Sequence, residues 1–163
     1  MLRVDQILPA RAHIAGLRIA HAVRVQWWRW SGAKVRGCRV LVLDAQGQVL
    51  LIRHSYGSGD WMMPGGGLGR DEDPVAGGLR EVWEETHCRL HPAVEIGHFN
   101  DPVSRREAHV VAGWTDDEPR ADGREIIEAR FFALDALPEA ISIKLRDRLP
   151  EWIKAATAAR PAG

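Results

Sequence analysis

Residues 61–88 read WMMPGGGLGRDEDPVAGGLREVWEETHC, and this stretch decides both the fold class and the candidate chemistry. It begins with a short apolar run, passes through a glycine-rich segment at 65–69, and continues from Pro74 with helical spacing. Asp73 is a favourable N-cap and proline is favoured at the first helical position, so we expect a helix from Pro74 to about His87.

Strand-like segments lie on both sides of this helix. A hairpin is expected where CRVLVLD and VLLIRH flank a turn at Gly47. The remaining elements that we expect are strands at 93–99, 108–114 and 126–134 and a helix at 142–158. Strands interleaved with helices, without an internal repeat, predict a single α/β (α+β) domain.

The acidic side chains of the central helix share one face. At about 100° per residue, Glu81, Glu84 and Glu85 fall on one side and the apolar residues on the other. Glu81 and Glu85 are like charges four residues apart, which costs about 0.2–0.5 kcal/mol, and carboxylates in a last turn oppose the helix dipole. A face that breaks two helix rules is expected to have a cationic partner, and oxygen ligands suit Mg²⁺ or Mn²⁺.

The alternative is a solvated acidic face that Arg80 neutralises. The glycines favour the metal, because glycine lets the backbone approach a ligand closely.

The spacing of these residues resembles the box of the Nudix hydrolase family. The matching positions are Gly66, Glu72, Arg80, Glu81, Val82, Glu84, Glu85 and Cys88. His87 stands where the family has glycine, at a position that ends the helix in a left-handed conformation, which histidine tolerates better than most residues. The resemblance implies a Nudix-like α/β/α sandwich with a central mixed β-sheet, to which an N-terminal helix would be added.

The resemblance also implies roles for these residues. Mg²⁺ or Mn²⁺ would be bound by Glu81, Glu84, Glu85 and the Gly65 carbonyl, and the glutamates would help to activate water. Arg80 would hold the carboxylates in orientation with Glu72 as its partner, and Gly66 opens the box.

An acid from a later loop often completes such a site. Glu125 is the first candidate for this further ligand, and Glu128 and Glu107 come after it. These three acids lie outside the box, so nothing in the motif supports them directly.

The implied reaction is attack of water on a phosphorus of a diphosphate linkage. The substrate would be a nucleoside diphosphate linked to another moiety, such as a nucleoside triphosphate, ADP-ribose or a nucleotide sugar. The residues that bind it are not predicted. Five aromatic residues could stack on a base, but we expect them in the core: Trp61, Phe99, Trp114, Phe131 and Phe132. The single tyrosine, Tyr56, precedes the box, whereas a downstream tyrosine is typical of the dinucleoside-polyphosphate subgroup.

The net charge of zero conceals a division along the chain. Residues 1–40 hold eight basic side chains and one acid, so the rest carries the compensating negative charge. We therefore divide the chain into a basic amphipathic helical arm at 1–36 and a Nudix hydrolase domain at 37–163.

The arm leaves several functions open. It would pack on the body, join two subunits in a homodimer, or hold RNA or an anionic surface, in which case the chain is a weakly catalytic binding protein. Arg18 and Arg24 interrupt the longest apolar region, so neither a membrane span nor a secretory signal is expected. Cys38 and Cys88 form no ligand motif, which fits a cytoplasmic protein.

Overall fold

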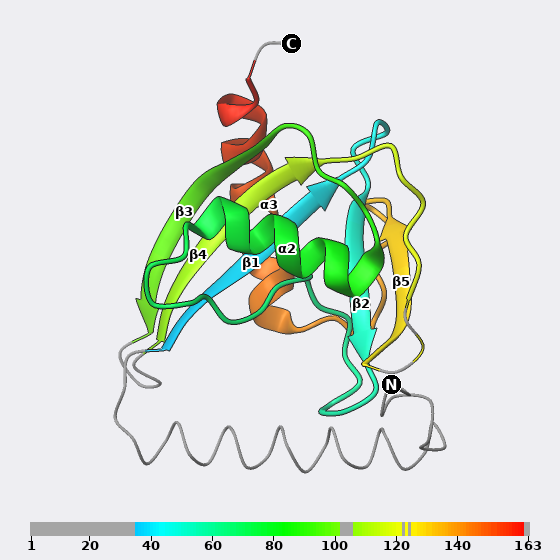
Figure 1. Ribbon diagram of the computed structural model, residues 1–163. Helices are drawn as coiled ribbons and strands as arrows, with labels where there is room; N and C mark the ends of the chain where they lie inside the picture. Colours follow the sequence, from blue (N-terminus) through cyan, green and yellow to red (C-terminus); the bar gives the residue numbers. More distant parts are fainter. Residues whose placement is uncertain (1–34, 102–105, 122, 124, 162–163) are drawn as a thin grey trace, which may run out of the picture.

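The computed structural model describes residues 35–101, 106–121, 123 and 125–161, and within them a sheet lies between two helices (Figure 1). In chain order the elements are β1 (Val35–Leu43), β2 (Val49–His54), α2 (Pro74–Thr86), β3 (Ala93–Asp101), β4 (Arg106–Trp114), β5 (Ile126–Phe132) and α3 (Ile143–Ala159). The helical arm predicted at 1–36 lies outside the described residues, except that 35–36 belong to β1.

The sheet has the order β3-β4-β1-β2-β5. β1 and β4 are parallel, whereas the other neighbouring strands are antiparallel. The sheet is therefore mixed, as predicted, and the connection from β1 to β4 includes β2, α2 and β3.

Asp44 builds the predicted hairpin between β1 and β2. Its Oδ1 accepts hydrogen bonds from the backbone of Gln46 at 2.9 Å and of Gln48 at 2.7 Å. Gly47 takes φ 75°, a left-handed conformation that glycine adopts without strain.

Alternating side chains of β1 build a core on each face of the sheet. Leu41 and Leu43 point toward α3, and Val40 and Val42 belong to the cluster below α2. Successive side chains of a strand point to opposite faces, so the apolar run of β1 fits a strand covered on both sides. This pattern confirms the predicted α/β/α sandwich of the described residues.

Several strand boundaries differ from the expectation, and β3 and β4 extend to Asp101 and from Arg106, where these two residues pair. β1 begins at Val35 rather than Cys38, because its first residues pair with the start of β4. β5 ends at Phe132 rather than Leu134, since Phe132 pairs with Val49, the first residue of β2. Both strands extend as far as their partners do.

Candidate active site

Both ends of α2 are fixed by local chemistry. The Asp73 carboxylate accepts a hydrogen bond from the Ala76 amide at 2.9 Å, with Pro74 in the first turn. At the other end, His87 has φ 59° and its amide donates to the Trp83 carbonyl at 3.0 Å. Histidine thus adopts the left-handed conformation predicted for it, and the helix ends where a glycine would end it.

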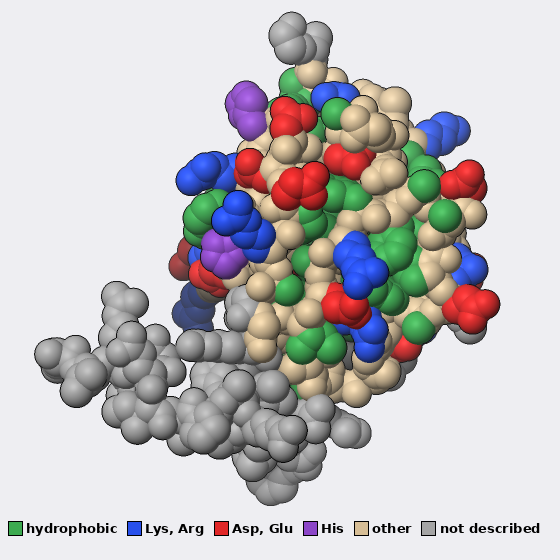
Figure 2. Space-filling model, turned by 90° about the vertical axis from the view of Figure 1, so that its right-hand side faces the viewer, with side chains coloured by type: hydrophobic (Ala, Val, Ile, Leu, Met, Phe, Trp, Pro, Cys, Tyr) green, Lys and Arg blue, Asp and Glu red, His purple; other side chains and the backbone are tan. Residues whose placement is uncertain are grey.

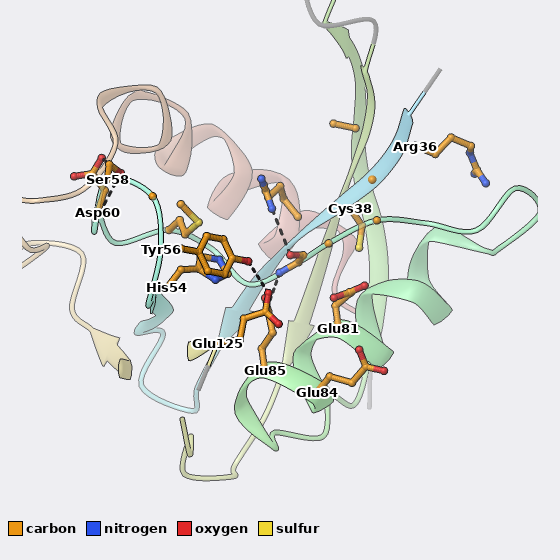
Figure 3. Close-up of a pocket in the computed structure, with 18 of the residues that line it drawn as sticks. Arg36, Cys38, His54, Tyr56, Ser58, Asp60, Glu81, Glu84, Glu85 and Glu125 are labelled. Atoms are coloured by element: carbon orange, nitrogen blue, oxygen red, sulfur yellow. Dashed lines mark hydrogen bonds between the residues drawn. The ribbon is translucent and has the colours of Figure 1, made fainter. Parts of the chain in front are cut away.

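Close packing on the sheet sets the rotation of α2. A Cβ added at Gly78 would lie 3.1 Å from Val40 Cγ2, so the absence of a side chain lets the helix approach the strand. Val82 is fully buried on the same side. The acidic side chains consequently lie on a neighbouring side of α2, where Glu81 and Glu85 border a cavity that residues of β1 also line (Figure 3).

The glycine segment forms the other side of this cavity by pairing with β1. Cys38 N donates to the Gly66 carbonyl and Val40 N to the Pro64 carbonyl, both at 2.9 Å. β2 pairs with β1 only at Leu43 and Val49, so this part of β1 is available to the glycine segment.

Gly65 and Gly66 are required by close contacts. Gly65 has φ 141°, and a Cβ on it would overlap the Cys38 carbonyl oxygen. A Cβ on Gly66 would overlap the Glu81 carboxylate. The segment therefore passes directly over Glu81 because these positions lack side chains.

Arg80 joins the glycine segment to the glutamates. Its Nε donates to Glu72 Oε1 at 3.0 Å, and its Nη1 donates to Glu81 Oε1 at 2.7 Å and to Glu84 Oε2 at 3.3 Å. Its Nη2 also donates to the Gly67 carbonyl at 3.1 Å. This geometry supports an orienting role for Arg80 and brings it together with its predicted partner Glu72.

Glu85 is the most perturbed acid of the described site. Its side chain is buried, and its Oε2 accepts a hydrogen bond from the Gly65 amide at 2.9 Å. Burial raises the pKa of the Glu85 carboxyl to about 8; the Gly65 amide opposes this rise, whereas the charges of Glu81 and Glu125 add to it. Burial likewise raises the pKa of Glu81, although the Arg80 guanidinium opposes the rise.

The cavity has a volume of about 540 Å³, within the range of small-molecule sites. Glu81, Glu84, Glu85 and Glu125 all border it. Glu125 comes from the segment before β5, and its charge contributes to the raised pKa values of Glu81 and Glu85. The structure therefore brings the first candidate from outside the box into the same cavity as the box glutamates.

The two secondary candidates have other partners. Glu107 borders the cavity but lies 3.9 Å from Arg36 and 3.5 Å from His109. Glu128 forms ion pairs with Arg53 at 2.7 Å and Arg130 at 2.9 Å, on β2 and β5. The β5 side, which faces the viewer in Figure 2, carries acidic and basic side chains close together. Glu128 does not border the cavity, so the structure separates it from the candidate site.

Among the described residues, the tyrosine that borders the cavity is not one of the five aromatic residues considered for stacking. Trp61 and Trp114 are buried in the core, as expected, and the Trp61 and Phe132 rings lie 4.8 Å apart. Phe131 packs against the core below α2. Phe99 is exposed, which corrects its expected place in the core: the guanidinium of Arg148 lies over its ring.

Tyr56 borders the cavity, beside Glu125 (Figure 3). Its position after β2 gave no sequence signal of this contact.

The donor atoms around the cavity fit a hard divalent cation. Burial and the nearby charge of Glu125 raise the pKa of Glu81 and of Glu85, so these carboxylates favour a nearby positive charge, and their oxygens are the ligands that Mg²⁺ and Mn²⁺ prefer. Among the described residues, no three His, Cys, Asp or Glu side chains form a closed metal cluster. Each of the three box carboxylates has a hydrogen-bond donor of its own, because Arg80 contacts Glu81 and Glu84 while the Gly65 amide contacts Glu85.

An α/β/α sandwich with a glutamate-bearing helix after a glycine segment defines a class of proteins, and sequence comparison identifies that class. The NUDIX domain model matches residues 33–155. The chain belongs to the Nudix hydrolase family.

Similarity to individual proteins covers shorter stretches. The chain is 44% identical over 63 residues to an RNA pyrophosphohydrolase of Roseobacter denitrificans, and this match covers 38% of this chain and 39% of that protein. It is 30% identical over 77 residues to the diphosphoinositol polyphosphate phosphohydrolase 3-beta of Bos taurus, which covers 47% of each. The chain thus spans less than half the length of these curated relatives.

The solved MutT protein of Methanosarcina mazei has the same fold. It superposes with a TM-score of 0.62 at 24% identity, covering 78% of this chain and 96% of that one. Separately, none of the helices in the described part of the chain is long and apolar enough to span a membrane.

Proposed function

We propose that this chain is a divalent-metal-dependent hydrolase that cleaves the diphosphate linkage of a nucleoside diphosphate joined to another moiety. The observation that carries the proposal is the grouping of Glu81, Glu85 and Glu125 around one cavity, where two of them have raised pKa values. Perturbed acids in a cleft are typical of functional sites. Family membership supports the same reaction class.

The metal would be held by the Gly65 carbonyl and the carboxylates of Glu81, Glu84, Glu85 and Glu125. When bound, Mg²⁺ or Mn²⁺ supplies neutralisation of the diphosphate charge and acidification of water. Without an ion, these acids would repel a polyanionic substrate, so the same residues that form the site make it dependent on a cation.

Residues of this chain would position the carboxylates and the substrate phosphates. Arg80 restrains Glu81 and Glu84, so that their carboxylates enter the cavity in defined orientations. Glu85, with a pKa of about 8, holds a proton near neutral pH until a nearby positive charge displaces it. Arg39 borders the cavity, and its Nη1 lies 3.5 Å from the Gly65 carbonyl. There it would bind a phosphate oxygen of the substrate.

The relatives provide the range of substrates to be tested. Their names include an RNA pyrophosphohydrolase and a diphosphoinositol polyphosphate phosphohydrolase, so substrates with and without a nucleobase both belong in the test. We propose the nucleotide type for this chain, as a nucleoside triphosphate, ADP-ribose or a nucleotide sugar.

Three further proposals concern the whole chain. They are the division into an arm at 1–36 and a domain at 37–163, a cytoplasmic location, and a homodimer formed through the arm. Sedimentation of the full chain and of a chain lacking residues 1–32 tests the dimer. A dimer that persists after the truncation rejects the arm as the contact.

The reaction is tested with purified full-length protein and a substrate panel. The panel contains canonical and oxidised nucleoside triphosphates, ADP-ribose, nucleotide sugars, dinucleoside polyphosphates and a diphosphoinositol polyphosphate. We expect release of a nucleoside monophosphate or phosphate from a nucleotide only with Mg²⁺ or Mn²⁺. Equal turnover in EDTA, or no turnover of any nucleotide, rejects the proposal.

A further inference from the structure

We propose that Tyr56, supported by His54, is the surface on which the nucleobase of the substrate stacks. This inference rests on the proposed function for the substrate class, and it adds the residues that recognise the base. It derives from the wall of the cavity opposite α2, where the two rings stack (Figure 3).

Two contacts fix the Tyr56 ring, and a backbone hydrogen bond fixes the segment that carries it. The His54 and Tyr56 ring centroids lie 5.0 Å apart with an interplanar angle of 29°, so the histidine supports one face of the tyrosine. The Tyr56 hydroxyl donates to Glu125 Oε1 at 2.5 Å. Between the rings in sequence, the Ser55 amide donates to the Glu125 carbonyl at 2.8 Å.

A ring held in this way is suited to stacking. Tyrosine presents a large planar surface, and here its orientation is set by the hydroxyl contact and by His54 before a ligand arrives. Binding then orders few additional side-chain rotamers, which favours affinity. The half-buried ring borders the cavity rather than the core, unlike the rings of Trp61 and Trp114.

The position of Tyr56 relative to the acids fits a nucleotide. Glu125 contacts the Tyr56 hydroxyl and also acts electrostatically on Glu81 and Glu85. The stacking surface and the acidic group therefore border the same cavity. A nucleotide with its base on Tyr56 would direct its phosphates toward α2.

The segment after Tyr56 supplies polar groups to the same wall. Gly57 and Gly59 take φ 86° and 76°, and the loop carries Ser58 and Asp60 at the cavity. The Ser58 hydroxyl donates to Asp60 Oδ2 at 2.7 Å. The Asp60 carboxylate is an acceptor for N–H groups at the edge of a base, whereas the ring recognises its face.

A binding experiment separates this inference from catalysis. Isothermal titration of the full-length protein with Mg²⁺ present compares AMP and GMP with ribose 5-phosphate, which has the phosphate and sugar but no base. The proteins are wild type, Tyr56→Leu, Tyr56→Phe and the control Phe99→Leu. Phe99 is an exposed aromatic residue that does not border the cavity, so its replacement removes a ring elsewhere.

We expect wild type to bind at least one of the two nucleotides about 5- to 150-fold more tightly than ribose 5-phosphate, the range for stacking one base on an aromatic side chain. Tyr56→Leu should reduce this preference by about tenfold or more, or to near unity where the preference is smaller. Tyr56→Phe and Phe99→Leu should retain most of it.

Equal wild-type affinities for the nucleotides and ribose 5-phosphate overturn the inference, and this comparison does not depend on any variant folding. A preserved preference in folded Tyr56→Leu, or a preference lost in Phe99→Leu instead, overturns it as well. Because no hydrolysis is measured, an inactive protein with a Tyr56-dependent base preference contradicts only the proposed reaction. Hydrolysis of nucleotides without any base preference contradicts only the stacking surface.

Discussion

Replacing Glu85 with glutamine should stabilise the metal-free protein while it removes catalysis. The native carboxyl has a pKa of about 8, against 4.5 for the ordinary side chain, because it is buried beside Glu81 and Glu125. The amide side chain of the Glu85→Gln variant would have nearly the same shape, and its carbonyl oxygen can accept the hydrogen bond from the Gly65 amide.

The direction and size of the effect follow from proton linkage. The unfolded chain loses this proton near pH 4.5 and the native state near pH 8, so wild-type stability falls as the pH rises between these values and levels off above them. At about 1.4 kcal/mol for each pKa unit, the rise from 4.5 to about 8 corresponds to an upper value of about 5 kcal/mol. Relaxation of the site reduces this value, and we expect about 2–5 kcal/mol at pH 8.

Urea unfolding in EDTA at several pH values measures the difference between wild type and Glu85→Gln. The free energy of unfolding should be equal near pH 4.5 and should diverge in favour of the variant up to pH 8. In thermal unfolding the same difference is roughly 5–15 °C in Tm at pH 8. Parallel pH profiles for the two proteins would refute the argument that Glu85 is a strained, buried carboxyl.

Three further substitutions test the geometry of the site. Gly66→Ala should lower turnover by about 10- to 100-fold because its Cβ displaces the Glu81 carboxylate, whereas Gly67→Ala, where a Cβ meets no atom within 4 Å, should stay within about threefold of wild type. Comparable losses in both variants would contradict the contact with Glu81. Arg80→Lys keeps the charge but loses the branched guanidinium that contacts Glu72 and Glu81. The metal concentration at half-maximal activity should therefore rise by about tenfold. An unchanged metal titration would reject the orienting role of Arg80. His87→Gly should raise the free energy of unfolding by about 0.5–1 kcal/mol with unchanged activity, since glycine adopts φ 59° without strain. A loss of stability would show that the ring contact of His87 with Trp83 stabilises the protein by more than the backbone strain costs.

The sequence predicted the features that depend on local spacing. The cap at Asp73, the stop at His87 and the common face of the glutamates require only helix geometry, and all three are present. The strands were placed by their strand-like composition and by the turn signals between them, although their ends depend on partners that the sequence does not reveal. β5 ends at Phe132 for this reason.

The wall of the cavity opposite α2 depends on tertiary contacts. Tyr56 and Glu125 are far apart in sequence, and they meet because β2 pairs with β5. Glu125 could be proposed as an acid on a later loop, but Tyr56 gave no periodic or motif signal. The close contact of Gly66 with Glu81 was likewise visible only in the structure.

The most direct test of the account is the Mn²⁺ dependence of hydrolysis of the best nucleotide in the panel. Wild type is compared with Glu84→Gln, Glu85→Gln and the control Glu151→Gln, which removes an exposed acid on α3. We predict no turnover in EDTA, a loss of about 10²- to 10⁴-fold in both site variants, and wild-type activity in the control. Metal-independent turnover, or full activity in both Glu84→Gln and Glu85→Gln, would contradict the claim that the acidic group around this cavity is a catalytic metal site.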